Sequence, residues 1–107
     1  MRYISGVEAV LRAVADESRR TLLEALAAGP ASAGDLAALL PIARPGVSRH
    51  LRVLREAGLV DSRPDNQRRL YELRPEGLTE IERWLAPYRL MWLRGLADLE
   101  RHLDEEE

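Results

Sequence analysis

Two short amphipathic segments, separated by only a few residues, constrain the fold of this chain more than any other feature. The first begins at an S-x-x-D capping pattern made by Ser32 and Asp35. The second ends at Gly58, and residues 41–45 connect the two. The apolar residues that mark the helical faces are Leu36, Leu39, Leu40, Val47, Leu51 and Leu54. Two helices joined so tightly predict a helix-turn-helix over residues 34–58.

Two further helices are expected before this pair. The first is indicated by apolar residues at three- and four-residue steps. Asp16 then provides an N-cap for the second helix, and Gly29 and Pro30 stop it. The apolar residues of the first helix are Val7, Val10, Leu11 and Val14.

After Gly58 the periodicity changes from that of a helix to that of a strand. Leu59–Arg63 and Arg68–Leu73 are expected to form a β-hairpin, with Pro64–Gln67 as its turn. The sequence therefore predicts a mainly α fold with a small β-hairpin wing at residues 59–73, a winged helix-turn-helix.

The last third of the chain, residues 75–104, is expected to form helices that pair two copies of the chain. Pro75 suits a first helical position, and Pro87 should kink or split the helical stretch that begins there. A coiled-coil-like stripe then runs along the helix at Leu85, Trp92, Leu96, Leu99 and Leu103. Such a stripe favours a homodimer. For Trp84, Tyr88, Met91 and Trp92, core packing is the simpler interpretation, and a pocket for a planar effector is the alternative.

Length and charge are consistent with one domain that binds a polyanion. The chain of 107 residues has room for a single domain, residues 1–107. Its net charge of -2 hides a segregation, because residues 43–74 hold eight arginines against four acids, a net charge of +4. A basic segment in an otherwise acidic chain is a candidate footprint for nucleic acid.

The second helix of a helix-turn-helix enters the major groove of DNA, and a wing reaches a neighbouring groove or phosphate. Arginine there can bind guanine through two hydrogen bonds, and a glycine lets the backbone approach closely. His50 could instead be a packing residue, although its position beside Leu51 favours DNA contact. The candidate DNA-binding residues are Arg44, Gly46, Ser48, Arg49, His50 and Arg52 on the helix, and Arg63, Gln67, Arg68 and Arg69 in the wing.

Two runs of residues resemble the ArsR family of bacterial repressors. They are Ala-Asp-Glu-Ser-Arg-Arg at 15–20 and the run from Val47 to Val60, within a similarity that extends from Val7 to Leu73. The resemblance implies a homodimeric repressor that binds a partly palindromic operator and pairs through its first and last helices. The dimer-interface residues expected on this basis are Val7, Leu11, Trp84, Leu85, Tyr88, Met91, Trp92, Leu96 and Leu99. Ala43, Arg44 and Gly46 depart from the family pattern, so base preference does not carry over.

No metal or other cofactor is expected. The cysteine motif of metal-sensing members corresponds to residues 32–34, which offer no soft ligand, and the chain has no cysteine. On the last helix, His102 has Asp98 one turn before it and Glu105 or Glu106 one turn after it. An Asp-x-x-x-His pair is more often a surface hydrogen bond, so a metal-responsive or small-molecule-responsive repressor stays an alternative, with the effector unknown.

The remaining expectations concern catalysis and location. Asp16, His50 and Ser48 could be imagined as a hydrolase triad, but the sequence shows neither a nucleophile turn nor an oxyanion hole, so no enzyme is expected. Charged residues interrupt every apolar run, and Glu8 and Arg12 interrupt what would be a signal peptide, so the chain is expected in the cytoplasm and not in a membrane. A winged helix that docks on an acidic protein is the alternative to DNA binding.

Overall fold

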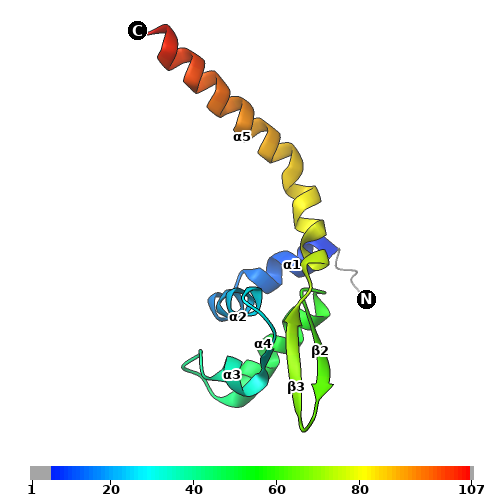
Figure 1. Cartoon of the computed structure of the whole chain (residues 1–107). Coiled ribbons are helices and arrows are strands. Elements are labelled where there is room, and N and C mark those ends of the chain that lie inside the picture. The colour runs from blue at the N-terminus through cyan, green and yellow to red at the C-terminus, as the bar shows by residue number, and fades with distance from the viewer. Residues whose placement is uncertain (1–5, 107) are drawn as a thin grey trace.

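The computed structural model describes residues 6–106. Figure 1 shows a helical body that carries a β-hairpin at one end, with one long helix leaving it at the other end. The elements in chain order are α1 (Gly6–Val14), α2 (Glu17–Ala27), β1 (Ala31–Ser32), α3 (Ala33–Ala37), α4 (Arg44–Glu56), β2 (Val60–Asp65), β3 (Arg68–Leu73), the 3-10 helix η1 (Pro75–Leu78) and α5 (Thr79–Glu105).

The core lies where α1, α2, α3 and α4 meet the start of β2. The apolar residues that the helical periodicity selected on α4 are all buried there, each at most 1% exposed. Burial of a leucine side chain contributes about 1.5 to 3 kcal/mol, so this cluster dominates the stability of the body. Its buried members are Val10, Ala13, Leu22, Leu26, Leu36, Val47, Leu51, Leu54, Leu59 and Val60.

Local capping sets the helix ends, as the sequence predicted for Asp16 and Ser32. The carboxylate of Asp16 accepts the backbone N–H of Arg19 at 3.0 Å, and the hydroxyl of Ser32 accepts that of Asp35 at 3.2 Å. Gly58, with a φ of 79°, ends α4. The next N–H, on Leu59, bonds the carbonyl of Leu54, which is the hydrogen bond of a Schellman motif.

The structure differs from the expected helix bounds at α3. That helix ends at Ala37, so Leu39 and Leu40 lie in the turn after it, and Leu39 is half exposed. The capping pattern fixed the start of α3 correctly. The apolar spacing predicted a longer helix than the structure has, because Leu39 and Leu40, which fit the helical period, lie in the connection to α4.

The wing is longer and its turn tighter than expected. Residues 60–65 pair with residues 68–73 in antiparallel register, from Val60 opposite Leu73 to Asp65 opposite Arg68. Pro64 and Asp65 therefore belong to β2, and the turn has only two residues, Asn66 and Gln67. A third strand, β1, was not expected; it pairs with β3 and completes a sheet of order β1-β3-β2.

Helix α5 runs unbroken across Pro87, so of the two alternatives that the sequence left open, a kinked helix or a split one, the split does not occur. The expectation of core packing for its aromatic residues is also wrong within one chain, because Trp84, Tyr88 and Trp92 are 46%, 54% and 68% exposed. Trp84 and Tyr88 do contact each other, with ring centroids 5.3 Å apart and ring planes tilted by 50°. Within residues 6–106, none of the helices combines the length and apolar composition needed to cross a membrane.

Candidate nucleic-acid interface

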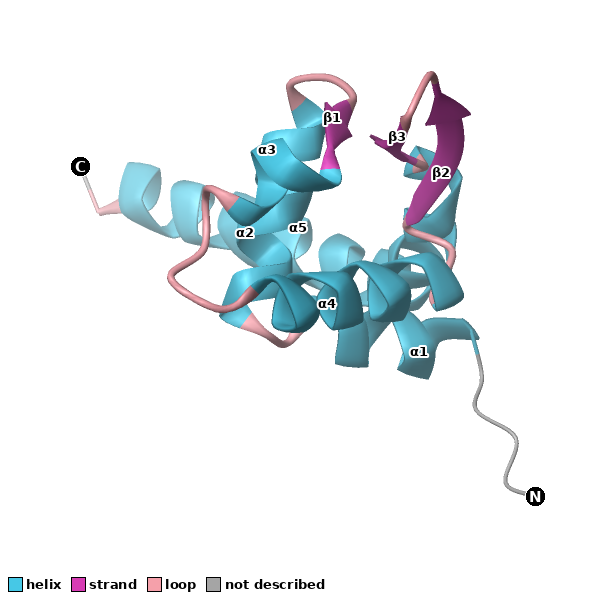
Figure 2. Cartoon of the chain, turned by 90° about the horizontal axis from the view of Figure 1, so that it is seen from below, coloured by secondary structure: helices cyan, strands magenta, loops and turns pink. Residues whose placement is uncertain are grey.

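Helices α3 and α4 and the tip of the β2–β3 hairpin share one end of the molecule. In Figure 1 they occupy the lower end, and α5 projects from the opposite end. Figure 2 looks at this lower end and shows α4 lying across it, with α3 and the hairpin on either side of a gap. Because α4 buries the face with Val47, Leu51 and Leu54, its opposite face is turned outward at this end.

Four of the polar residues expected to contact DNA are exposed on α4, three of them on its outward face and Arg44 in its first turn, on the side of α3. Arg44, Ser48, Arg49 and Arg52 are exposed. The side chains of the three arginines make no hydrogen bond or ion pair within residues 6–106, so their guanidinium groups are available to a ligand. Arginine has five N–H donors and stays charged at every physiological pH, which suits it to phosphates and to the edge of guanine.

Packing against Ile42 favours glycine at position 46, a contact that the sequence did not reveal. A Cβ at this position would lie 3.2 Å from Cδ1 of Ile42, a closer contact than side chains usually make. The absent side chain therefore lets the turn before α4 pack against its first turn. A close approach of the Gly46 backbone to DNA remains a prediction.

His50 is turned toward the junction of α1 and α2. Its Nδ1 lies 3.3 Å from Nη1 of Arg19 and 3.9 Å from the Asp16 carboxylate, and its side chain is only 19% exposed. Arg19 is itself fixed there, since it donates to the backbone carbonyls of Ala13 at 2.7 Å and Arg12 at 3.0 Å. This geometry favours the packing interpretation of His50 over DNA contact.

Asp16 completes this cluster. The backbone N–H of Arg19 donates to its carboxylate and holds the pKa of Asp16 below the usual 3.8, and the charges of Arg19 and His50 act in the same direction. The carboxylate thus caps α2 and balances the charge of Arg19. Among the described residues Ser48 makes no hydrogen bond to His50, so Asp16 and His50 come together without the nucleophile that a triad needs.

The wing carries its arginines near the turn. Arg68 pairs with Asp65 at 3.2 Å across the turn, and Arg63 pairs with Glu72 at 3.4 Å along the sheet. Gln67, Arg68 and Arg69 are exposed. The wing candidates thus gather near the turn, with Arg63 and Arg68 on one face of the hairpin and Arg69 on the other, and Arg63 is paired with Glu72.

Ser62 links the wing to α4, a role that sequence reasoning missed. Its hydroxyl accepts hydrogen bonds from Arg55 at 3.2 Å and from Arg69 at 3.3 Å. Arg55 lies in the last turn of α4 and Arg69 in β3. A serine at an alternating strand position gives no sequence signal for this contact, which depends on how the hairpin packs on α4.

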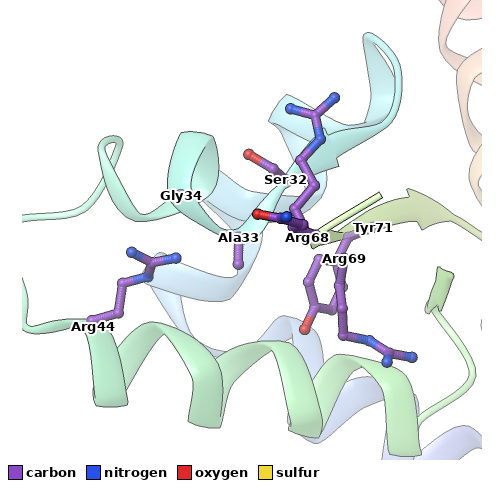
Figure 3. Close-up of a pocket in the computed structure, with 8 residues that line it drawn as sticks. Ser32, Ala33, Gly34, Arg44, Arg68, Arg69 and Tyr71 are labelled. Atoms are coloured by element: carbon purple, nitrogen blue, oxygen red, sulfur yellow. The ribbon is translucent and has the colours of Figure 1, made fainter. Parts of the chain in front are cut away.

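A cavity of about 400 Å³ lies between α3, the start of α4 and the wing. Figure 3 shows Arg44 projecting from α4 toward Ala33 and Gly34, with Arg68, Arg69 and Tyr71 on the side of β3. Pairing of β1 with β3 places Ser32 at this border. The lining residues are Ser32, Ala33, Gly34, Arg44, Gln67, Arg68, Arg69 and Tyr71.

The candidate metal ligands on α5 contact other partners. His102 lies 3.2 Å from the carboxylate of Glu106, and Asp98 pairs with Arg101. In the part of the chain that the structure describes, no three His, Cys, Asp or Glu side chains are grouped so that they could hold a metal ion.

Comparison with known proteins identifies the fold and the family. A family described as a helix-turn-helix domain matches residues 14–63. The HTH-type transcriptional regulator Rv2034 of Mycobacterium tuberculosis is 43% identical over 95 residues, which cover 89% of this chain and 86% of that protein. The transcriptional repressor SdpR of Bacillus subtilis is 32% identical over 79 residues, or 74% of this chain and 88% of SdpR.

A solved structure agrees with these sequence relatives. The ArsR family transcriptional regulator RHA00566 superposes with a TM-score of 0.76 at 28% identity, covering 85% of this chain and 94% of that one. The winged helix-turn-helix and the DNA-binding role predicted from the sequence are thereby confirmed. The chain belongs to the ArsR family of helix-turn-helix transcriptional regulators.

Proposed function

We propose that this regulator is a repressor that binds a partly palindromic operator as a homodimer, without catalysing a reaction. One observation carries the proposal: α4 presents three exposed arginines whose side chains have no hydrogen-bond or ion-pair partner among residues 6–106. Arg49 and Arg52 lie on its outward face and Arg44 in its first turn, and α4 shares this end of the molecule with the wing (Figure 2). The relative SdpR is a transcriptional repressor, which supports repression over activation. Because the relatives are bacterial, the cytoplasm is the proposed place of action.

Each basic element has a proposed task. The outward residues of α4 enter the major groove, where Ser48, Arg49 and Arg52 reach base edges or phosphates. The wing brings Gln67, Arg68 and Arg69 to the adjacent backbone or groove, and Arg63 contributes only if it exchanges Glu72 for a phosphate. Gly46 packs against Ile42 and also lets its backbone approach DNA, whereas His50 acts indirectly through its contact with Arg19.

Dimerisation is supported by the apolar residues that α5 leaves uncovered. Leu85, Trp92, Leu96 and Leu99 are 37% to 68% exposed, which is unusual for side chains of this size. Val7 and Leu11 on α1, with Trp84, Tyr88 and Met91 on α5, extend the same proposed interface. A two-fold axis would set the two α4 helices about 34 Å apart, one turn of DNA.

The test is a titration of DNA from the promoter of the protein's own gene, followed by fluorescence anisotropy at several salt concentrations. Affinity should exceed that for a scrambled fragment and should fall steeply with salt, because bound phosphates release counterions. Arg49→Ala should weaken operator binding by about 1 to 3 kcal/mol if Arg49 reads a base. Arg94→Ala, which removes the same charge on α5, is the matched control and should change little.

Equal affinity for operator and scrambled DNA would contradict DNA-specific regulation. Together with one partner protein recovered from lysate at fixed stoichiometry, it would support a protein-binding module. No contact within the described residues favours this alternative, so it enters only as a result that the titration can return.

A further inference from the structure

We propose that an apolar cavity between α2 and the base of the wing, where β2 begins and β3 ends, binds a small ammonium compound with an apolar body, and that this ligand is an effector of DNA binding. The binding site goes beyond the proposed function. The effector role rests on the proposed function, so the two parts are tested by separate measurements.

The cavity has a volume of about 230 Å³ and lies where four segments of the chain meet. In Figure 1, β3 runs from the hairpin tip toward the start of α5, and α2 lies beside its upper end. Leu59 is 0% exposed and lies at the bottom of the cavity, whereas Leu78 is 41% exposed and lies at its edge. The lining residues are Leu23, Glu24 and Ala27 on α2, Leu59 before β2, Leu73 at the end of β3 and Leu78 in η1.

The lining favours an apolar group of limited size. Five of the six lining residues are aliphatic, and their side chains offer no hydrogen-bond partner that would hold water in the cavity. A dry cavity of about 150 Å³ with such a lining accommodates benzene. This cavity therefore has room for a ring of that size with a short chain attached, and it is too small for a helix.

Glu24 gives the site its charge preference. Its carboxylate lines the cavity and has no hydrogen-bond or ion-pair partner within residues 6–106. Arg20, one helical turn before it, donates instead to the backbone carbonyl of Val14 at 2.8 Å. An ammonium group can donate to the free carboxylate while its apolar body enters the cavity. Because an exposed ion pair contributes little energy, burial of the apolar body supplies most of the affinity and Glu24 selects a cation.

The walls of the cavity connect the parts that the proposed function assigns to DNA. Leu59 follows the end of α4, and its backbone carbonyl accepts the N–H of Arg74 at 2.8 Å. Leu73 lies opposite Val60 in the hairpin, and α2 packs on both α4 and β3. A ligand that fills the cavity therefore stabilises this arrangement of α2, α4 and the wing. It should strengthen operator binding, and operator DNA should strengthen ligand binding by the same factor.

Phenethylamine and phenethyl alcohol test the site without DNA, because they have the same size and differ in charge. Titration at pH 7 is followed through the backbone amide signals of the protein in NMR spectra. Both probes should shift the signals of residues 23–27, 59, 73 and 78, and the amine should bind about two- to fivefold more tightly. Shifts confined to Trp84, Tyr88 and Trp92 would place the probes on the aromatic residues of α5 and would overturn the proposal.

Glu24→Gln tests the charge preference. The variant should bind both probes equally, with an unchanged affinity for the alcohol. Glu100→Gln, which removes an exposed carboxylate on α5, is the matched control and should keep the preference for the amine. A preference for the amine that survives in Glu24→Gln would contradict the role of this carboxylate.

Ala27→Leu tests the cavity itself. Ala27 is exposed at the end of α2, so a leucine is compatible with the helix and occupies part of the cavity. Both probes should bind at least about fivefold more weakly, whereas Ala97→Leu, with the same change on an exposed part of α5, should bind like wild type. Circular dichroism verifies the fold of both variants. Unchanged probe binding in a folded Ala27→Leu would overturn the site.

The effector role is measured by operator titration with and without saturating phenethylamine. Operator affinity should rise about fivefold in wild type and stay unchanged in Ala27→Leu. Unchanged operator affinity in wild type would overturn the effector role. A wild type that binds operator and scrambled DNA equally would refute the proposed function, and the NMR titration would still decide the site.

A second copy of the chain that covers the cavity would give a different result. Probe binding would then weaken as the protein concentration rises, and the probes would lower the mass measured by light scattering. That result, or no binding of either probe, would overturn the proposal.

Discussion

At the scale of single residues, Asp16 connects helix capping to the seating of α4. Its carboxylate accepts the N–H of Arg19 at 3.0 Å and lies 3.9 Å from Nδ1 of His50. Asp16→Ala removes the acceptor and should lower the free energy of unfolding by about 1 kcal/mol, whereas Asp16→Asn keeps an acceptor and should cost less. Urea unfolding at pH 7 measures both. Equal losses in the two variants would contradict a capping role.

The pH dependence of the same residue follows from its lowered pKa. Since the folded state holds the pKa of Asp16 below 3.8, its charge contributes stability that is fully present above about pH 4 and is lost as the pH falls through the folded-state pKa. The difference in unfolding free energy between wild type and Asp16→Asn should therefore shrink between pH 6 and pH 3. A difference that stays constant over this range would count against the electrostatic contribution.

Gly77 is a second residue whose role only the tertiary structure reveals. A Cβ there would lie 2.2 Å from the carbonyl oxygen of Gly58, so η1 could not stay against the end of α4. Gly77→Ala should destabilise the chain by about 1 to 3 kcal/mol through overpacking. Gly95→Ala, with nothing within 4 Å of the added methyl, should be neutral or slightly stabilising in the same unfolding measurement.

Residues such as these mark the limit of prediction from sequence. Asp16 and Ser32 were predictable caps because a cap is a local pattern, and both make the expected hydrogen bonds. His50 was predicted to contact DNA because it lies beside Leu51 and not on its face, and Gly46 because a residue without a side chain lets the backbone approach DNA; both contacts stay predictions. Their partners, Arg19 and Ile42, belong to other segments and become neighbours only when the chain folds.

At the scale of elements, the wing depends on one residue with positive φ. Asn66 has a φ of 58° in the two-residue turn between β2 and β3. Asparagine tolerates this conformation better than alanine, and glycine adopts it freely. Asn66→Ala should lower the free energy of unfolding by about 1 kcal/mol, and Asn66→Gly should stay within about 0.5 kcal/mol of wild type. An alanine variant as stable as wild type would show that the turn adopts another conformation.

Elements with strong periodicity were predicted well. Helix α4 was found because Val47, Leu51 and Leu54 repeat at helical spacing and are all buried. Strand β1 was missed because two residues have no period, and only pairing with β3 makes Ala31–Ser32 a strand. Pro87 did not split α5. It removes one backbone hydrogen bond, but in an exposed helix water can bind the carbonyl that is left without its partner, so the helix continues.

At the scale of the whole molecule, a single chain is more extended than a compact domain of the same length. Its radius of gyration is 18.6 Å, whereas a compact domain of this length would have about 13 Å. The excess comes from α5, which leaves the body as an isolated helix (Figure 1). Isolated helices gain most of their stability by packing an apolar face, so α5 needs a surface to cover it.

Two leucines with nearly equal exposure, Leu90 and Leu99, can test which surface covers α5. Leu90 and Leu99 are 56% and 54% exposed, and nine residues at about 100° each place them on opposite sides of the helix. Leu99 shares the stripe with Leu85, Trp92 and Leu96, whereas Leu90 does not. If the stripe forms the dimer interface, Leu99→Glu places two charges at the symmetric seam and should shift the protein from dimer to monomer, while Leu90→Glu should not.

Light scattering at micromolar concentration measures the mass of both variants. The monomer has one recognition helix, so Leu99→Glu should also lose most of its operator affinity, because two half-sites bound together gain affinity that one half-site lacks. Leu90→Glu should bind like wild type. A wild-type protein that is monomeric at this concentration, or a dimer that Leu90→Glu dissociates and Leu99→Glu leaves intact, would show that another surface covers α5.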